Sequence, residues 1–435
     1  MSNLNIINQN PPLDLLLLLL LIPAQIELFS HGDYFLIILL LLYMAATLWQ
    51  PLSDLEQLPE KFGVQRLMFL LRLSLLFLML LISPISVAVQ NIQARLQADA
   101  GQGDVNEAYL HMHDGAYQVE MALERLTNGD NPYAASYNDS IMLLWNLETG
   151  VNPAVEHLIY LPGLLLLSMP FQAVTTAVLG FYDQRLLYLL AFVIVIFILP
   201  TIVQKPMYKL ALIVGIGLNP WVAKPVAVGM NDIMIILCLL IAAVLLHKKH
   251  PYWAAIILGL ACTMKQSAWL ITPFFLLAIY LAAPPEKRWR QVITAVALIA
   301  LMMIIIIGPL ALWDLPAFID DTFAYASGTA SSLNYPIRGY TLGRLLVVFE
   351  TVASDQDTYP FWRWQLLFGL PVLALSLYYQ WRQHTLPAMF LAASFFIFAL
   401  GFVSRYFQYN YVGFVVTLAF LGLFPTFTDK PADKE

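Results

Sequence analysis

The sequence predicts an all-α, polytopic transmembrane protein, and two features of its composition carry this prediction. Hydrophobic residues fill 60% of the 435 positions and charged residues only 11%, whereas a soluble domain has about 25% charged residues. The uncharged runs are also long enough to cross a bilayer, which takes about 20 residues of helix. The clearest run is 292–313, which has no charged residue.

Apolar runs of this kind predict about 12 membrane spans, with a range of about 11 to 13. The predicted spans are 13–29, 34–52, 66–89, 186–203, 208–220, 225–246, 252–264, 266–282, 291–313, 361–379, 386–402 and 406–424. No basic residue precedes the leucine run of the first span, so it is interpreted as a membrane helix and not as a cleavable signal peptide. Two spans, 208–220 and 252–264, cross only with tilt or with support from neighbouring helices.

Basic residues indicate which side of this predicted bundle faces the cytoplasm. They cluster in short loops, at Lys61 and Arg66, Lys205 and Lys209, Lys248 and Lys249, Lys287, Arg288 and Arg290, and Arg382. The positive-inside rule places such loops in the cytoplasm. Both termini are then cytoplasmic, and two long segments, 90–185 and 314–360, lie on the extracytoplasmic face.

Residues 158–180 test this topology, because they are apolar enough to cross the membrane. If they crossed, the basic loop at 205–209 would lie outside. Pro162, Gly163 and Pro170 also interrupt the stretch. We therefore expect a juxtamembrane or re-entrant pair of short helices on the outer face, which would form part of the wall of a site.

The helical loop predicted after the third span is the strongest candidate for chemistry. Residues 111–133 read HMHDGAYQVEMALERLTNGDNPY and carry Asp, His, Glu and Arg in an otherwise apolar chain. The spacing of apolar residues after Asp114 predicts a short helix that ends at Asn128-Gly129. Asp114 is then either the N-cap of this helix or a general base that accepts a proton from an attacking hydroxyl. His113 either binds a phosphate, tunes Asp114 or is simply solvated.

Two polar groups interrupt the apolar spans farther along the chain. Asn231 and Asp232 open the span 225–246 at its outer end, either as helix caps or as a polar wall of a substrate cavity. Lys265 lies between two apolar runs, at the outer tip of a broken hairpin, where a charge is costly unless it pairs or faces water. It is interpreted as a ligand for a lipid-linked phosphate, with snorkelling to the interface as the alternative.

Two arginines are further candidates for binding phosphate. Arg338 lies in the second outer segment, and Arg405 precedes the last span. Arginine binds phosphate through two parallel donors, although an isolated surface arginine is often only solvated, and the tyrosines near Arg405 also fit an interfacial aromatic belt. All of these polar groups fall on one face of the predicted bundle. The chain has no P-loop and no HExxH motif, so neither nucleotide hydrolysis nor zinc chemistry is indicated.

Several of these motifs resemble a known family. HDGAYQ around Asp114, NGDNPY at 128–133 and IYLPG at 159–163 resemble the first outer loop of GT-C glycosyltransferases. GMND at 229–232, followed by LGLACTMKQSAWLITP at 258–273, is similar to bacterial members that use polyprenyl-phosphate mannose.

The resemblance divides the chain into three parts. Residues 1–65 hold two spans that precede the family's usual first helix, with a cytoplasmic loop. Residues 66–424 form a GT-C-like transmembrane catalytic module with outer loops 90–185 and 314–360. Residues 425–435 are a cytoplasmic tail.

The resemblance implies an enzyme that takes a hexose, with mannose favoured, from a polyprenyl-phosphate sugar and transfers it with inversion to a hydroxyl of a lipid or glycan. The role of general base then falls on Asp114. The residues expected to bind the donor phosphate or the substrate are His113, Asn231, Asp232, Lys265, Arg338 and Arg405. Neither a cofactor nor a metal is expected, because the first outer loop offers one strong acid, with Glu120 and Glu124 as weaker seconds.

The expected protein is thus a multi-pass enzyme of the cell membrane, with its site on the extracytoplasmic face and with membrane lipids, but no nucleic acid, as partners. Two other classes stay open, a secondary transporter and a non-catalytic assembly factor. The absence of an internal repeat and the long polar loop favour the enzyme over the transporter. A cavity at one interface containing Asp114 would also favour the enzyme, whereas a polar path at the bilayer midplane would favour the transporter.

Overall fold

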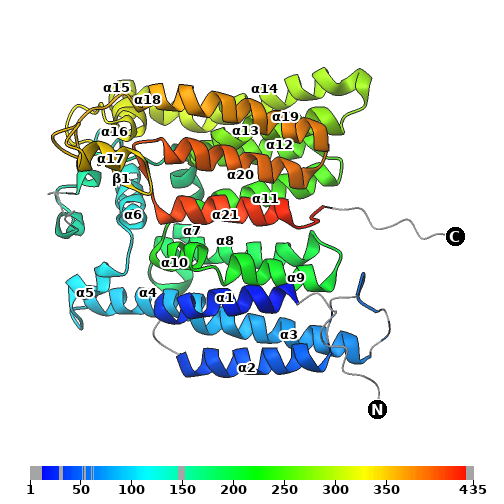
Figure 1. Cartoon of the computed structure of the whole chain (residues 1–435). Coiled ribbons are helices and arrows are strands. Elements are labelled where there is room, and N and C mark those ends of the chain that lie inside the picture. The colour runs from blue at the N-terminus through cyan, green and yellow to red at the C-terminus, as the bar shows by residue number, and fades with distance from the viewer. Residues whose placement is uncertain are drawn as a thin grey trace, which may run out of the picture.

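The computed structural model describes residues 12–28, 33–50, 52, 55–59, 61, 63–145 and 152–427. In these residues the chain is all-α except for two short strands, β1 (Arg338–Gly339) and β2 (Tyr406–Phe407), which pair in parallel. Figure 1 shows long helices side by side, with shorter helices and loops gathered at one end. The prediction of an all-α, polytopic protein is confirmed.

The helices of the bundle mostly follow the apolar runs, because a helix that faces lipid or buried neighbours on every side needs no polar stripe. They are α1 (Leu13–Leu28), α2 (Asp33–Trp49), α3 (Val64–Leu80), which continues through a π-helical turn into α4 (Ser86–Asp99), α8 (Gln184–Ile198), α9 (Pro206–Leu212), α10 (Pro220–Val228), α11 (Asp232–His247), α12 (Pro251–Met264), α13 (Ser267–Ala282), α14 (Arg288–Trp313), α19 (Leu370–Gln383), α20 (Leu386–Phe402) and α21 (Tyr409–Leu423).

Six further helices lie at one end of the bundle, which we call the loop end (Figure 1). They are α5 (Val105–Leu110), α6 (Asp114–Thr127), α15 (Leu315–Ile319), α16 (Tyr325–Ser327), α17 (Gly343–Val348) and α18 (Phe361–Trp364). α6 is the helix predicted after the third span. It ends as expected, with Asn128 as its C-cap and Gly129 at a φ of 86°.

Helix length and composition identify the protein as multi-pass. Four segments of the described residues are long and apolar enough to cross a membrane: Val64–Asp99, Pro162–Leu179, Gln184–Thr201 and Pro285–Trp313. Pro206–Gly217 and Pro220–Val228 meet the same criterion together, and six shorter apolar helices accompany them. The count of about 12 spans stays a prediction, because length and composition alone identify four or five.

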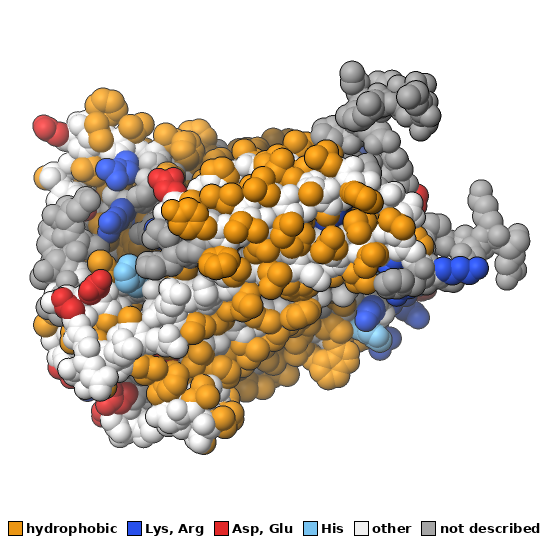
Figure 2. Space-filling view, turned by 90° about the horizontal axis from the view of Figure 1, so that it is seen from below, with side chains coloured by type: hydrophobic (Ala, Val, Ile, Leu, Met, Phe, Trp, Pro, Cys, Tyr) orange, Lys and Arg blue, Asp and Glu red, His pale blue; other side chains and the backbone are white. Residues whose placement is uncertain are grey.

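The opposite end of the bundle, which we call the basic end, is formed by the start of α9 and the ends of α11 and α21 (Figure 1). Phe427 N donates to Ile202 O at 2.7 Å, and its ring lies 6.0 Å from that of His247. The loops at Lys205 and Lys248, predicted to be cytoplasmic, therefore share this end. Figure 2 shows Lys and Arg side chains here and a broad hydrophobic surface between the two ends.

Residues 158–180 form one continuous helix, α7 (Pro162–Leu179), so the predicted pair of short helices is wrong. Pro162 stands in the first turn, where its missing N–H costs nothing. Pro170 lies within the helix, where it removes one internal hydrogen bond. The break falls only at Gly180, which caps the helix with a φ of 81°.

α7 nevertheless does not run from one end of the bundle to the other. Leu161 N donates to Met264 O at 3.3 Å, and Gln184 N donates to Glu120 Oε1 at 2.7 Å, so both flanks of α7 contact the loop end. The chain from Leu179 to Gln184 reaches at most about 18 Å, which is too short to return across about 30 Å of hydrocarbon. α7 therefore stops short of the basic end.

The predicted span 225–246 is also divided differently. Asn219 caps α10 by accepting a hydrogen bond from Trp221 N, and α10 continues α9 across a bend of 50°. Gly229, at a φ of 96°, ends α10, and α11 begins at Asp232. The GMND motif therefore lies in a break between two helices, where its side chains can face a cavity.

At Gly163 the backbone of α7 lies close to Thr263 of α12, and alanine at this position is expected to destabilise the contact. A Cβ at position 163 would lie 2.1 Å from Thr263 Oγ1 and 2.7 Å from the Thr263 carbonyl oxygen. We expect Gly163→Ala to reduce the free energy of unfolding by about 1–3 kcal/mol, seen as a lower melting temperature in detergent. Gly308→Ala is the matched control, because a Cβ there meets nothing within 4 Å. Equal melting temperatures for the two variants would contradict the contact.

Candidate active site

A cavity of about 1080 Å³ lies at the loop end. Its wall comes from segments far apart in the sequence: the start of α6, residues 152–160, the break between α10 and α11, the link between α12 and α13, and the loops that follow α16 and α20. The predicted site residues that line it are His113, Asp114, Asn231, Asp232, Lys265, Arg338 and Arg405. The structure thus brings all seven together, while their roles stay predictions.

Asp114 is held at the cavity wall by two N–H donors. Its Oδ1 accepts from Gly115 N at 2.7 Å, and its Oδ2 accepts from Asn152 Nδ2 at 2.7 Å. The carboxylate lies in the first turn of α6, where the helix dipole favours negative charge. About a quarter of its side chain (27%) stays exposed, so a group in the cavity can reach it.

The N-cap of α6 is His113, and the interpretation of Asp114 as the cap is therefore wrong. His113 Nδ1 accepts from Gly115 N at 3.0 Å and lies 3.1 Å from Asp114 Oδ1. Because Nδ1 accepts this bond, a neutral His113 carries its proton on Nε2. His113 N also donates to Val228 O at 2.7 Å, which ties the start of α6 to the end of α10.

Lys265 is paired and buried, so the snorkelling interpretation is wrong. Its Nζ lies 2.7 Å from Asp232 Oδ1 and 3.0 Å from Asn231 Oδ1, and 4.9 Å from the centre of the Tyr411 ring. Asn410 Nδ2 donates to the other oxygen of Asp232 at 2.7 Å. The ammonium and carboxylate thus satisfy each other in the wall of the cavity.

The helix-cap interpretation of the GMND motif is also wrong. Asn231 occupies the N-cap position of α11 but makes no side-chain cap hydrogen bond. Its amide oxygen accepts from Lys265 instead. Asn231 and Asp232 are therefore a polar part of the cavity wall, the alternative that the sequence left open.

Arg405 anchors the second outer segment through backbone carbonyls. Its guanidinium donates to the carbonyl oxygens of Tyr335, of Asp357 at 2.7 Å and of Asp355 at 3.1 Å. The side chain is buried, and this burial lowers the pKa of Arg405 to about 10. Three of its five N–H donors are thus occupied, which leaves it less available to a phosphate than the sequence indicated.

Arg338 has the opposite environment. Its backbone lies in β1, and its side chain lines the cavity without an ion pair or hydrogen bond to any residue in the described part of the chain. It is half-buried. Arg338 is therefore a cation that is positioned by its strand and remains available to an anion.

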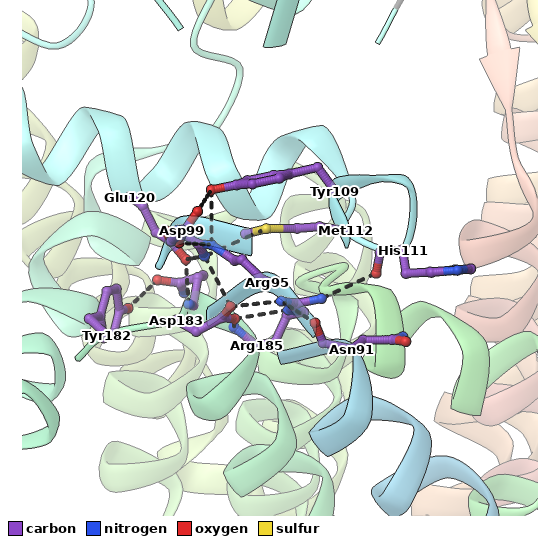
Figure 3. A network of polar contacts seen from close by, with 11 residues as sticks. Asn91, Arg95, Asp99, Tyr109, His111, Met112, Glu120, Tyr182, Asp183 and Arg185 are labelled. Atoms are coloured by element: carbon purple, nitrogen blue, oxygen red, sulfur yellow. Dashed lines mark hydrogen bonds and ion pairs between the residues drawn. The ribbon is translucent and has the colours of Figure 1, made fainter. Parts of the chain in front are cut away.

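Glu120, expected as a weaker second acid, faces away from the cavity, and that interpretation is wrong. Its carboxylate accepts from Arg95 Nη1 at 2.9 Å and Nη2 at 2.6 Å, and from Gln184 N at 2.7 Å. It therefore joins α6 to α4 and α8 (Figure 3). Glu124 does not line the cavity either.

The same network fixes the turn that precedes Asp114. Asp183 accepts from Arg95 Nη1 at 2.9 Å and from Arg185 Nη2 at 2.8 Å. Arg185 Nη1 in turn donates to the carbonyl oxygen of His111 at 3.2 Å. Figure 3 shows the two guanidiniums among the carboxylates at the meeting point of these helices. Opposite charges thus compensate one another, and α6 is held firmly with Asp114 at its start.

One group of His and Asp side chains in the described residues has the spacing of a metal site. His157 lines the cavity, and its Nδ1 faces Asp321 and Asp320, which follow α15. The three ligand atoms lie within 4.8 Å of one another. Burial raises the pKa of the Asp321 carboxyl to about 6.

Sequence reasoning missed Asn152, His157 and Asn410. Asn152 precedes a proline, a pair that indicates only a turn, and Asn410 lies among tyrosines. A neutral polar residue is ordinary in a loop and attracts no notice, whereas a lysine between two apolar runs is unusual. Their importance appears only when folding places them against Asp114, Asp321 and Asp232.

The fold and the cavity define a multi-pass membrane protein with a cavity lined by charged and polar side chains at one end of its bundle. Residues 158–404 match glycosyltransferase family 87, which is more than half of the 435 residues. The chain therefore belongs to glycosyltransferase family 87 and is a GT-C-type membrane glycosyltransferase. No curated protein and no solved structure matches it.

Family membership confirms the predicted GT-C resemblance and selects a glycosyltransferase over the transporter and the assembly factor. The match is shorter than the expected range of 66–424. It includes Lys265 and Arg338, but it begins after Asp114 and ends just before Arg405. The roles of Asp114 and Arg405 therefore rest on the geometry of the cavity.

Proposed function

We propose that the protein transfers a hexose, with mannose favoured, from a polyprenyl-phosphate sugar to a hydroxyl of a lipid or glycan at the extracytoplasmic face. The observation that carries the proposal is that two groups line one cavity of a family 87 glycosyltransferase: a held carboxylate, Asp114, and a guanidinium, Arg338, that is paired with no residue in the described part of the chain. The carboxylate suits an acceptor hydroxyl, and the guanidinium suits a phosphate.

The reaction is a single displacement at the anomeric carbon of the donor. The acceptor oxygen attacks from the face opposite the phosphate and forms the new glycosidic bond, while the bond between the anomeric carbon and the phosphate oxygen breaks. The hydroxyl proton passes to the Asp114 carboxylate. The polyprenyl phosphate leaves with the bonding electrons, and Arg338 stabilises its charge, with His113 Nε2 as a second donor.

Apolar side chains in the cavity lining support a lipid-linked donor. They include Trp269, Leu270, Phe323, Trp362 and Leu400. Phe323 and Trp362 are 42% and 58% exposed, so the apolar lining reaches the surface of the protein, where a prenyl chain can stay in contact with lipid. A nucleotide sugar would gain nothing from such a wall.

The distribution of charge supports an extracytoplasmic site. The loops at Lys205 and Lys248 belong to the basic end, and the cavity lies at the loop end. The positive-inside rule orients the basic end toward the cytoplasm. The cavity would then open on the face where polyprenyl-phosphate sugars are used.

Arg338→Ala is expected to weaken donor binding without weakening the fold. The lost charge-assisted bond is worth about 1.5–3 kcal/mol, so KM for the donor should rise about 10- to 100-fold. The melting temperature should not change, since no described side chain depends on Arg338. Arg344→Ala is the matched control, because Arg344 is exposed and does not line the cavity. A normal KM in Arg338→Ala would remove Arg338 from the donor site.

The donor class is tested with purified protein, a membrane lipid extract as the source of acceptor, and two radiolabelled donors used separately. Polyprenyl-phosphate mannose should yield labelled product, and nucleoside-diphosphate mannose should yield none. Transfer from the nucleotide sugar, or no transfer from the lipid-linked sugar in protein that is folded, would contradict the proposal.

A further inference from the structure

His157, Asp320 and Asp321 point three potential ligand atoms at one position outside the proposed catalytic pair. His157 Nδ1 lies 3.0 Å from Asp321 Oδ1 and 3.8 Å from Asp320 Oδ2. Two ligand atoms bound to one ion, with bonds of about 2.0–2.2 Å, lie about 3–4.2 Å apart, depending on the angle between the two bonds. The observed spacing therefore fits a single small cation as well as it fits a hydrogen bond.

The surroundings of the three side chains orient them as the outer contacts of a metal site do. Asp321 Oδ2 accepts from Leu158 N at 2.9 Å. Ser331 donates to both oxygens of Asp320, from N at 2.9 Å and from Oγ at 2.7 Å. His157 Nε2 lies 2.9 Å from Ser332 Oγ. An imidazole that donates from Nε2 to a hydroxyl presents an unprotonated Nδ1, as metal-ligating histidines do.

The local charge also calls for a cation. Asp320 and Asp321 are adjacent in sequence, and within the described residues His157 is the only side chain that forms an ion pair with either of them. Asp321 and His157 are only 3% and 2% exposed. A buried carboxylate is costly unless a positive charge compensates it, so the Asp321 carboxylate favours a cation, and Asp320, whose side chain is 25% exposed, adds negative charge beside it.

We propose that these three residues bind one divalent transition-metal ion, Mn²⁺ or Zn²⁺. A nitrogen and two carboxylate oxygens suit such borderline ions, whereas Ca²⁺ and Mg²⁺ prefer oxygen alone. The ion would join the segment that contains His157 to the π-helical turn Asp320–Ala324, which continues α15. This proposal departs from the expectation that no metal is bound. That expectation was based only on the acids of the first outer loop.

The ion has a positioning role in this arrangement and does not take part in the transfer. Asn152, which holds Asp114 Oδ2, lies five residues before His157 in the same short segment. Fixing His157 to Asp320 and Asp321 would limit the movement of this segment and so of Asn152. Loss of the ion is therefore expected to lower the melting temperature as well as the activity.

The test is direct metal binding by the full-length protein in detergent, after removal of metal with a chelator. Titration with Mn²⁺, followed by electron paramagnetic resonance, should give one bound ion per chain, displaced by Zn²⁺. Asp320→Asn should weaken binding by about tenfold or more. This variant is diagnostic because a metal-free hydrogen bond between His157 and Asp321 would not need Asp320. His157→Gln should weaken binding as well.

Asp130→Asn is the matched control, because Asp130 is an exposed acid outside the cluster. It should bind Mn²⁺ like the wild type. Wild type and Asp320→Asn titrating alike would overturn the proposal, and so would a wild-type protein that binds no ion. Because the readout is metal binding and a melting temperature raised by the ion, its failure is distinct from a failure of the transfer assay.

Discussion

Replacing Asp114 with asparagine is expected to slow hexose transfer by about 10²- to 10⁴-fold, the usual contribution of a positioned general base. Asparagine has the same shape, and its amide oxygen can still accept from Gly115 N or from Asn152, but it cannot take the proton of the acceptor hydroxyl. The fold and donor binding should therefore be retained. The measurement is the initial rate of transfer at saturating donor, together with the melting temperature.

Two further variants test whether the lower transfer rate of Asp114→Asn is due to the loss of a general base. Asn152→Ala leaves the Asp114 carboxylate in place but removes one of its two donors, so it should reduce the rate by a smaller factor. Asp130→Asn changes an exposed acid in the same loop and should leave the rate unchanged. If Asp114→Asn transferred hexose at the wild-type rate, another group would have to be the base.

Breaking the pair of Lys265 and Asp232 is expected to cause the largest loss of stability. Removal of one member of a buried ion pair leaves the other uncompensated and costs about 3–5 kcal/mol. In Asp232→Ala, Lys265 would keep only the amide oxygen of Asn231 and the ring of Tyr411. Lys265→Met would in turn leave the Asp232 carboxylate without its ammonium partner. Both single variants should melt well below the wild type in detergent.

This experiment separates two roles for Lys265. If its ammonium bound the donor phosphate instead of Asp232, Lys265→Met would raise KM for the donor and leave the melting temperature nearly unchanged. Lys224→Met is the control, since Lys224 is exposed and its ammonium lies over the face of the Tyr409 ring. A stable Lys265→Met protein with a high KM would contradict the structural role argued from the 2.7 Å contact with Asp232.

Much of the fold follows from composition, whereas its helix breaks do not. Long apolar runs predicted the bundle, and the spacing after Asp114 predicted α6 and its end at Asn128. The prolines in α7 led to the wrong prediction. A proline in the first turn starts a helix, but from the sequence alone it looks the same as a proline that interrupts one. Likewise, Asn219 caps the start of α10 and so separates it from α9. A hydropathy profile gives no signal for such a cap.

The charged members of the site were predictable because a charge beside apolar spans is costly and needs a reason. Their partners were not. Lys265 and Asp232 are 33 positions apart, and no pattern in one sequence joins them. Arg338 and Arg405 looked alike as phosphate ligands, yet three carbonyls occupy Arg405 and no described side chain occupies Arg338. The residue type indicates what a side chain can bind, but only the folded structure shows whether another part of the protein already binds that side chain.

The central claim is that this cavity holds a lipid-phosphate sugar between Arg338 and Asp114. The most direct measurement is a cryo-electron microscopy structure of the wild-type protein with a non-transferable polyprenyl-phosphonate mannose. We predict the phosphonate within hydrogen-bond distance of Arg338, the prenyl chain along Trp269 and Trp362, and the anomeric carbon on the side of Asp114. A sugar bound outside this cavity, or a phosphonate that does not contact Arg338, would contradict this claim.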